Sequence, residues 1–143
     1  MSYSPAAMRA ASTGPQVRIR SIAIITSDAY SLVNFRGPLI EDLIGTGVRV
    51  FALAPDYDDE TRSNVARIGA TPIDISLDRT GMHPVRDIAD AVRLTFKLRA
   101  PKPDATLAYF IKPVIYGTLA ARAAGVRRRF ALIAGLGYVF TND

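Results

Sequence analysis

The sequence predicts an α/β fold: a Rossmann-like, doubly wound parallel sheet of about five strands. Short β-branched apolar runs alternate with amphipathic helical patterns along most of the chain, and this alternation is typical of parallel sheets with right-handed crossovers. The apolar runs are nearly continuous, which indicates strands that are buried on both faces. With 143 residues, the chain has the size of one ordinary domain.

Five apolar runs account for the predicted strands. The first contains Ile22, Ile24 and Ile25 within a stretch of nine residues, and the third is weakened by Pro72 because proline cannot donate to a ladder. The predicted strands are Arg18–Thr26, Val48–Ala54, Thr71–Leu77, Ala105–Phe110 and Phe130–Ala134.

Four helical patterns lie between these strands. Glycine follows three of them, at Gly45, Gly69 and Gly125, as is usual after a helix C-terminus. The predicted helices are Phe35–Ile44, Asp58–Ile68, Val85–Leu98 and Pro113–Ala124. In the third helix, an apolar face that packs on the sheet is expected from Val85, Ile88, Ala89, Val92 and Phe96.

The composition excludes several classes of function. There is no cysteine and a single histidine, which excludes disulfide scaffolds, cysteine nucleophiles and multi-histidine metal sites. No metal and no cofactor are expected. The formal charge is 18 − 13 = +5, but basic and aromatic residues are not interleaved, so no nucleic-acid partner is expected.

The two ends of the domain are also predicted from composition. Residues 1–17 are rich in Ser, Ala and Pro without an apolar core, so we expect a disordered tail rather than a secretory signal. Residues 18–143 are expected to form the folded domain. No apolar stretch reaches the roughly 20 residues that a bilayer needs. We therefore expect a cytoplasmic protein.

Parallel sheets of this kind bind ligands beyond the carboxyl ends of their strands, and unusual residues gather in the loops that follow the predicted strands. Asn34 and Arg36 follow the first strand, and Lys112 follows the fourth. Each has an ordinary alternative, as a helix cap or a solvated side chain. The loop after the first strand is neither a dinucleotide fingerprint nor a P-loop, although a small nucleotide-binding domain remains a third hypothesis.

The only histidine, His83, lies in the loop after the third strand. It is the one candidate for a base near neutral pH, and no other catalytic residue is assigned. The alternative is an ordinary hydrogen-bonding or solvent-facing histidine. Gly135 and Gly137 follow the fifth strand, where they allow a close approach to the backbone or form a tight turn.

Two groups of basic residues lie away from these loops. Arg127, Arg128 and Arg129 precede the fifth strand, which places them at the amino end of the sheet. Arg86, Arg93 and Lys97 share one side of the third helix. The latter group could meet anionic lipid, placing the protein peripherally at the inner face of the plasma membrane, or could form an ordinary polar face.

Six short motifs together resemble the N-terminal domain of family-4 glycosyltransferases. The resemblance covers roughly residues 18–140 and favours the subgroup that extends polyprenyl-diphosphate-linked glycans of the cell envelope. The motifs are Asn34-Phe35-Arg36-Gly37, Gly47-Val48-Arg49-Val50 with Ala54-Pro55, Arg79-Thr80-Gly81-Met82-His83-Pro84 with Asp87, Lys102-Pro103-Asp104, Ile111-Lys112-Pro113 with Ile115-Tyr116-Gly117, and Gly135-Leu136-Gly137-Tyr138 with Phe140.

The resemblance implies one half of a two-domain GT-B enzyme that retains anomeric configuration. In that architecture the N-terminal half mainly holds the acceptor, a glycan or polyprenyl-diphosphate-linked glycan. The C-terminal half holds the nucleotide-sugar donor with a pair of glutamates. The substrate-binding residues that the resemblance implies are Asn34, Arg36, Arg79, His83, Lys112, Gly135, Gly137 and Tyr138.

The chain departs from the family in three respects. No double glycine lies between Ser27 and Asn34, which argues against a direct diphosphate role for that loop, and His83 replaces a frequent asparagine. No glutamate pair follows Phe140, so the domain is expected to be truncated and inactive alone. A split subunit, a truncated product and a fragment stay open. A non-catalytic subunit that recruits a partner to the membrane is the alternative function.

Overall fold

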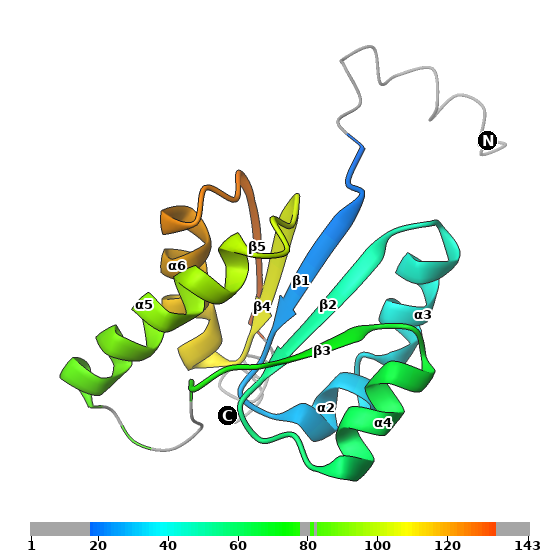
Figure 1. The fold of residues 1–143 in the computed structure, drawn as a ribbon, viewed down its shortest axis with the longest axis horizontal. Helices are drawn as coiled ribbons and strands as arrows, with labels where there is room; N and C mark the ends of the chain where they lie inside the picture. The colour runs from blue at the N-terminus through cyan, green and yellow to red at the C-terminus, as the bar shows by residue number, and fades with distance from the viewer. Residues whose placement is uncertain (1–17, 78–80, 82, 134–143) are drawn as a thin grey trace, which may run out of the picture.

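Five parallel strands form one sheet in the order β3-β2-β1-β4-β5 (Figure 1). The structure is a computed structural model that describes residues 18–77, 81 and 83–133. Within that part the predicted fold class and the number of strands are confirmed. The strands are β1 (Ser21–Ile25), β2 (Arg49–Ala54), β3 (Thr71–Asp74), β4 (Ala105–Tyr109) and β5 (Arg128–Leu132).

Helices cover both faces of the sheet, and each face has its own apolar core. On one face lie α2 (Ala29–Asn34), α3 (Gly37–Gly45) and α4 (Asp59–Arg67), and on the other lie α5 (Pro84–Arg99), η1 (Pro113–Gly117) and α6 (Thr118–Ala123) (Figure 1). Neighbouring residues of β1 alternate between the two cores: Ile24 packs with the first group of helices and Ile25 with the second. This alternation explains why the strand is apolar throughout.

The helix predicted at Phe35–Ile44 corresponds to α3, which begins two residues later and ends one residue later. The prediction missed α2, which ends at Asn34 just before this range. Asp28 starts α2 by accepting a hydrogen bond from the Tyr30 amide at 3.2 Å. The Phe35 and Arg36 amides both donate to the Ser31 carbonyl oxygen. The helix is interrupted there and restarts at Gly37, with Pro38 in the first turn of α3, a position that proline tolerates.

The prediction for the buried face of the third helix is also wrong. Four of the five apolar residues expected to pack on the sheet, among them Val85 and Phe96, are exposed large side chains of α5, and the fifth, Ala89, is exposed as well. The buried face is formed instead by Asp87, Asp90, Leu94, Thr95 and Leu98. The two carboxylates are accommodated because Lys112 and Ser76 pair with them.

Several smaller differences affect the ends of the elements. The helix predicted at Pro113–Ala124 begins as the π-helix η1 and continues as α6. Gly117 lies against β1, where a Cβ atom would come within 3.3 Å of the Ile25 side chain. The third strand ends at Asp74 rather than at residue 77, because its partner β2 ends at Ala54, the residue opposite Asp74.

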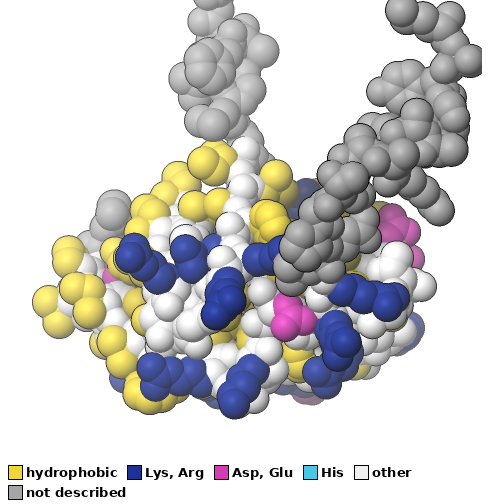
Figure 2. Space-filling view, turned by 90° about the horizontal axis from the view of Figure 1, so that it is seen from above, with side chains coloured by type: hydrophobic (Ala, Val, Ile, Leu, Met, Phe, Trp, Pro, Cys, Tyr) yellow, Lys and Arg dark blue, Asp and Glu magenta, His cyan; other side chains and the backbone are white. Residues whose placement is uncertain are grey.

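Basic side chains concentrate at the edge where the strands begin. Arg20 precedes β1, Arg49 opens β2, Lys102 precedes β4 and Arg127 precedes β5, and all four are exposed. Figure 2 looks onto this edge and shows Lys and Arg spread across it with few Asp and Glu. Since helices of this fold end here, the cations complement the negative ends of the helix dipoles. The triple-arginine run lies at the amino edge as predicted, but only Arg127 precedes β5, because Arg128 and Arg129 are the first two residues of the strand.

Candidate functional site

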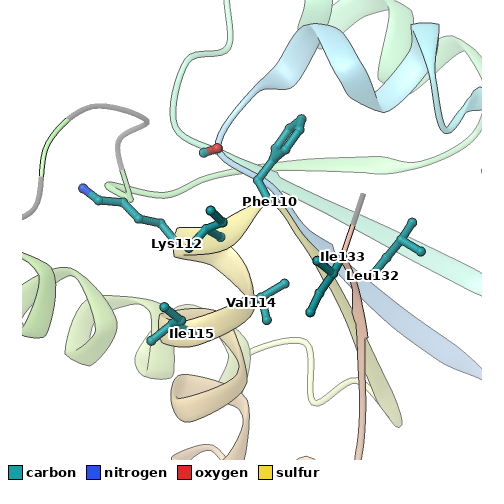
Figure 3. A pocket seen from close by; sticks show the side chains of 8 residues that line it. Phe110, Lys112, Val114, Ile115, Leu132 and Ile133 are labelled. Atoms are coloured by element: carbon teal, nitrogen blue, oxygen red, sulfur yellow. The ribbon is translucent and has the colours of Figure 1, made fainter. Parts of the chain in front are cut away.

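A largely apolar pocket of about 550 Å³ opens at the carboxyl ends of β1, β4 and β5, the edge where a ligand site is expected. Val114 in η1 and Ile133 after β5 point toward one another across it, whereas the Lys112 side chain extends away from Leu132 and Ile133 (Figure 3). The pocket is lined by Ser27, Phe110, Ile111, Lys112, Val114, Ile115, Leu132 and Ile133.

The backbone turns sharply where β4 ends at this pocket. Phe110 has a φ of 71°, in the left-handed region that bulky residues avoid at a cost of about 1–2 kcal/mol. Its ring packs against Tyr109 with the centroids 4.9 Å apart, and its carbonyl oxygen accepts a hydrogen bond from the Val114 amide. Such local strain concentrates at functional sites, and here it places an aromatic side chain on the pocket wall.

Lys112 is held at the rim by a buried ion pair. Its Nζ atom lies 3.1 Å from Oδ1 of Asp87, and Oδ2 of Asp87 accepts a hydrogen bond from the His83 amide at 3.3 Å. Asp87 therefore joins two residues predicted for the site, Lys112 and His83. The His83 side chain itself is exposed at the start of α5 and lines a different, shallow hollow.

Arg36 lies on the opposite face of the sheet from α5, against the end of β4. Its guanidinium carbon is 4.9 Å from the centroid of the Tyr109 ring, and its buried Nε atom has no hydrogen-bond partner among the described residues. The Tyr109 hydroxyl is 2.6 Å from Oγ of Ser31, and burial raises the pKa of this tyrosine, opposed by the hydrogen bond to Ser31. Arg36 does not line the apolar pocket.

The loop after β1 offers little to an anion. The backbone amides at the start of α2 already donate to carboxylates. Asp28 accepts from the Tyr30 amide, and Oδ1 of Asp56 accepts from the Ala29 amide at 2.7 Å. Negative charge at this helix start would repel phosphate. Asn34 donates its side-chain amide to the Tyr30 carbonyl oxygen at 2.8 Å. The structure thus brings neither Asn34 nor Arg36 to the apolar pocket.

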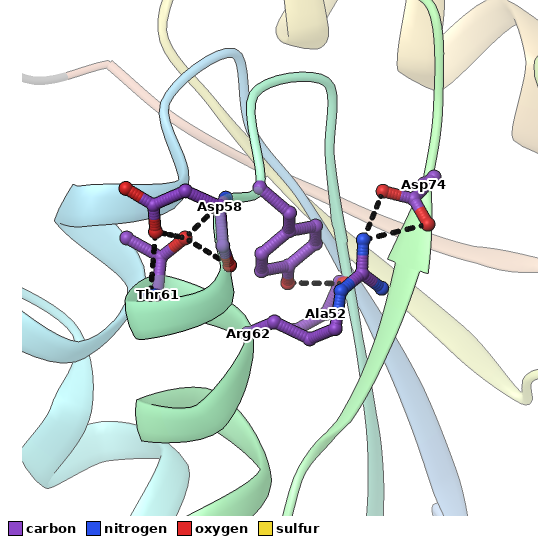
Figure 4. Close-up of polar contacts among 6 residues, drawn as sticks. Ala52, Asp58, Thr61, Arg62 and Asp74 are labelled. Carbon is purple, nitrogen blue, oxygen red and sulfur yellow. Dashed lines mark hydrogen bonds and ion pairs between the residues drawn. The ribbon is translucent and has the colours of Figure 1, made fainter.

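Polar contacts on the far side of the sheet stabilise α4 (Figure 4). Asp58 and Thr61 form a reciprocal capping box, and Arg62 makes two contacts with Asp74, at 2.7 and 3.0 Å. The Tyr57 hydroxyl donates to the Ala52 carbonyl oxygen at 2.7 Å. Burial raises the pKa of Tyr57 well above its ordinary value, an effect that the nearby Arg62 cation opposes. These contacts are structural and lie away from the pocket.

Four residues predicted for substrate binding lie outside the described residues: Arg79, Gly135, Gly137 and Tyr138. Among the described residues, no group of three or more His, Asp or Glu side chains is arranged to hold a metal ion. In the same part of the chain, no helix combines the length and apolar character needed to cross a bilayer.

Sequence reasoning missed most of the pocket wall. Leu132 and Ser27 gave no signal beyond their place at strand ends. Ile111 and Ile115 appear in the motifs of the resemblance, and their position beside Lys112 could have indicated an apolar wall. The left-handed backbone of Phe110 gives no sequence signal, because phenylalanine rarely adopts it.

The fold resembles part of GT-B proteins, although no family model and no curated protein matches the sequence. MurG of Acinetobacter baumannii superposes with a TM-score of 0.59 and 20% identity over 80% of this chain and 33% of its own. The glycotransferase of kitacinnamycin superposes with a TM-score of 0.53 and 20% identity, over 82% of this chain and 31% of its own. UDP-N-acetylglucosamine 2-epimerase superposes with a TM-score of 0.57 and 14% identity, over 82% of this chain and 32% of its own.

These comparisons confirm the predicted fold at the level of the domain. The chain spans about a third of the length of each of these proteins. At such low identity the likeness shows the fold alone, and it includes both glycosyltransferases and an epimerase.

Proposed function

We propose that this chain is the acceptor-binding part of a retaining glycosyltransferase that moves a sugar from a nucleotide-sugar to a lipid-linked glycan. The observation that carries the proposal is the apolar pocket at the carboxyl ends of the strands. A polar sugar or a nucleotide would leave its hydrogen-bonding groups unpaired against such walls. A polyprenyl chain matches them, because its apolar surface leaves water when it enters.

Lys112, at the rim of the pocket, suits the diphosphate end of such an acceptor. Among the described residues, Lys112 is the one cation that lines the pocket, and a diphosphate group beside a prenyl chain would bring negative charge to that rim. Asp87 holds the ammonium group in place and thereby limits how far it can turn. The role proposed for Lys112 is to position the diphosphate, not to take part in the transfer.

The donor would be held by a separate C-terminal domain. Transition-state stabilisation requires donor and acceptor to be fixed in one geometry, so we expect the purified chain to transfer no sugar alone. Transfer should require a second polypeptide or segment that binds the nucleotide-sugar. NMR of the product then shows whether the transferred sugar keeps the anomeric configuration that it had in the donor.

The acceptor proposal is tested by binding farnesyl diphosphate, the probe that combines a short prenyl chain with a diphosphate. We expect Ile115→Asp, which puts a charge on the pocket wall, to weaken binding at least tenfold. Leu119→Asp is the matched control, because Leu119 is exposed one turn later and does not line the pocket. Equal binding by Ile115→Asp and the wild type, or equally tight binding of inorganic diphosphate, would contradict the proposal.

A second candidate is a non-catalytic subunit that recruits a partner to the inner face of the plasma membrane. The exposed apolar residues of α5 favour it. This function needs membrane contact but no acceptor, so it predicts vesicle binding together with no measurable affinity for farnesyl diphosphate.

A further inference from the structure

The outward side of α5 carries an apolar stripe beside a row of cations. The apolar stripe consists of Val85, Ile88, Val92 and Phe96, and its two end residues are 85% and 62% exposed. At about 100° per residue these four side chains fall within a sector of about 80°. Val85 to Phe96 spans most of the helix, so the stripe is a feature of the whole helix rather than of one turn.

The cations of α5 lie next to this stripe. Arg86, Arg93 and Lys97 are exposed, and the same helical arithmetic places them within about 40° of one another, adjacent to the apolar stripe. Near the end of the helix the Arg99 guanidinium lies 5.5 Å from the centroid of the Phe96 ring. A shallow hollow of about 450 Å³ at this end combines the apolar Ile73 and Phe96 with the cations Arg93 and Lys97.

The acidic residues of the helix point the other way. Asp87 and Asp90 are buried against the sheet side, where Asp87 pairs with Lys112 and Asp90 accepts from Oγ of Ser76 at 2.8 Å. Asp90 also forms an ion pair with Arg93 at 3.4 Å, whereas Arg93 itself remains well exposed. The outer face of α5 is therefore positive and apolar at once. That combination is typical of helices that lie in the plane of a membrane interface.

We propose that α5 docks this domain on an anionic lipid bilayer, with the apolar stripe in the interfacial region and Arg86, Arg93 and Lys97 on the headgroups. A purely polar anionic partner would leave the apolar stripe in water, and a neutral apolar partner would offer no counter-charge to Arg86 and Lys97. The inference rests on the proposed function only in that a lipid-linked acceptor requires the domain to be at a membrane.

Insertion of the apolar stripe into a lipid bilayer is tested with a single fluorescent tryptophan. The chain has no tryptophan, so Phe96→Trp introduces the only indole, and Phe35→Trp is the matched control because Phe35 is 66% exposed at the end of α2 on the opposite face. With vesicles of phosphatidylcholine and phosphatidylglycerol in equal parts, we expect a blue shift for Phe96→Trp and none for Phe35→Trp. No shift in Phe96→Trp, or the same shift in both variants, would overturn the proposal.

The contribution of charge is tested by sedimentation with the same vesicles. Each cation near an anionic surface contributes about fivefold in partitioning, so Lys97→Gln is expected to bind about fivefold more weakly. Arg67→Gln, which removes a cation from the last turn of α4, should bind as the wild type does. Equal binding to pure phosphatidylcholine vesicles, or a dimer in solution that Val92→Ser dissociates, would contradict lipid docking. If the chain binds farnesyl diphosphate but not vesicles, the lipid-docking proposal is wrong and the acceptor proposal still stands.

Discussion

The ammonium group of Lys112 lies 3.1 Å from the carboxylate of Asp87, and the two side chains are only 12% and 3% exposed. The other ion pairs found among the described residues each have at least one well-exposed partner. This contact joins the start of η1 to the first turn of α5. It therefore links the rim of the apolar pocket to the helix that carries the exposed apolar stripe.

Removing one partner of this pair should be strongly destabilising. Asp87→Asn removes the carboxylate that pairs with the buried ammonium of Lys112, and breaking such a buried pair typically costs about 3–5 kcal/mol. Chemical denaturation measures the free energy of unfolding. Asp74→Asn is the control, since it breaks the exposed pair with Arg62 and should have a much smaller effect. Similar losses in both variants would show that the Lys112 pair is not buried in solution.

Substitutions along α5 should separate its two faces. Leu94→Ala empties a buried site and is expected to lower the free energy of unfolding by about 2–5 kcal/mol. Val92→Ala, two residues earlier on the exposed stripe, should stay within about 0.5 kcal/mol of the wild type. If Val92→Ala proved the more damaging, the buried face first expected from the sequence would be the right one.

The sequence contained two competing patterns in this helix, which explains the incorrect prediction. Val85, Ile88, Val92 and Phe96 form a longer apolar series than Leu94 and Leu98, so hydrophobicity favoured the wrong face. The buried face is completed by Asp87 and Asp90, whose partners Lys112 and Ser76 lie 25 and 14 residues away along the chain. Helical periodicity carries no information about contacts that depend on the arrangement of the sheet.

The strand-end rule points to the carboxyl edge of the sheet, where the apolar pocket opens. Lys112, which follows β4, lines this pocket, and its role in binding stays a prediction. Asn34 and Arg36 do not line this pocket, because the break between α2 and α3 turns Asn34 back onto Tyr30 and places Arg36 over Tyr109. The interruption depends on local amide bonds to Ser31, which apolar spacing does not reveal.

Phe110 offers a test of whether backbone strain serves the pocket. Phe110→Asn introduces a residue that tolerates a left-handed backbone, while removing the ring from the pocket wall. We expect little change in the free energy of unfolding, because relief of strain offsets the lost ring contact with Tyr109. Affinity for farnesyl diphosphate should fall severalfold, as measured by calorimetry. Unchanged affinity would remove the ring from the proposed acceptor site.

Alkaline pH should destabilise the domain through Tyr57. Burial raises the pKa of this phenol in the folded chain, whereas an unfolded tyrosine titrates near pH ~10. Above that pH the folded state keeps a proton that the unfolded state loses. Unfolding then releases a proton, and the free energy of unfolding falls by at most about 1.4 kcal/mol per pH unit.

Tyr57→Phe isolates this contribution. The variant loses the hydrogen bond to the Ala52 carbonyl oxygen, so at neutral pH it should be less stable by about 1 kcal/mol. Its stability should then fall less steeply than that of the wild type above pH ~10, so that the two curves converge. Tyr109, whose pKa is also raised by burial, remains in both proteins and cancels in the comparison. Parallel curves in urea denaturation across this range would mean that the Tyr57 hydroxyl is ionised as readily in the folded chain as in the unfolded one.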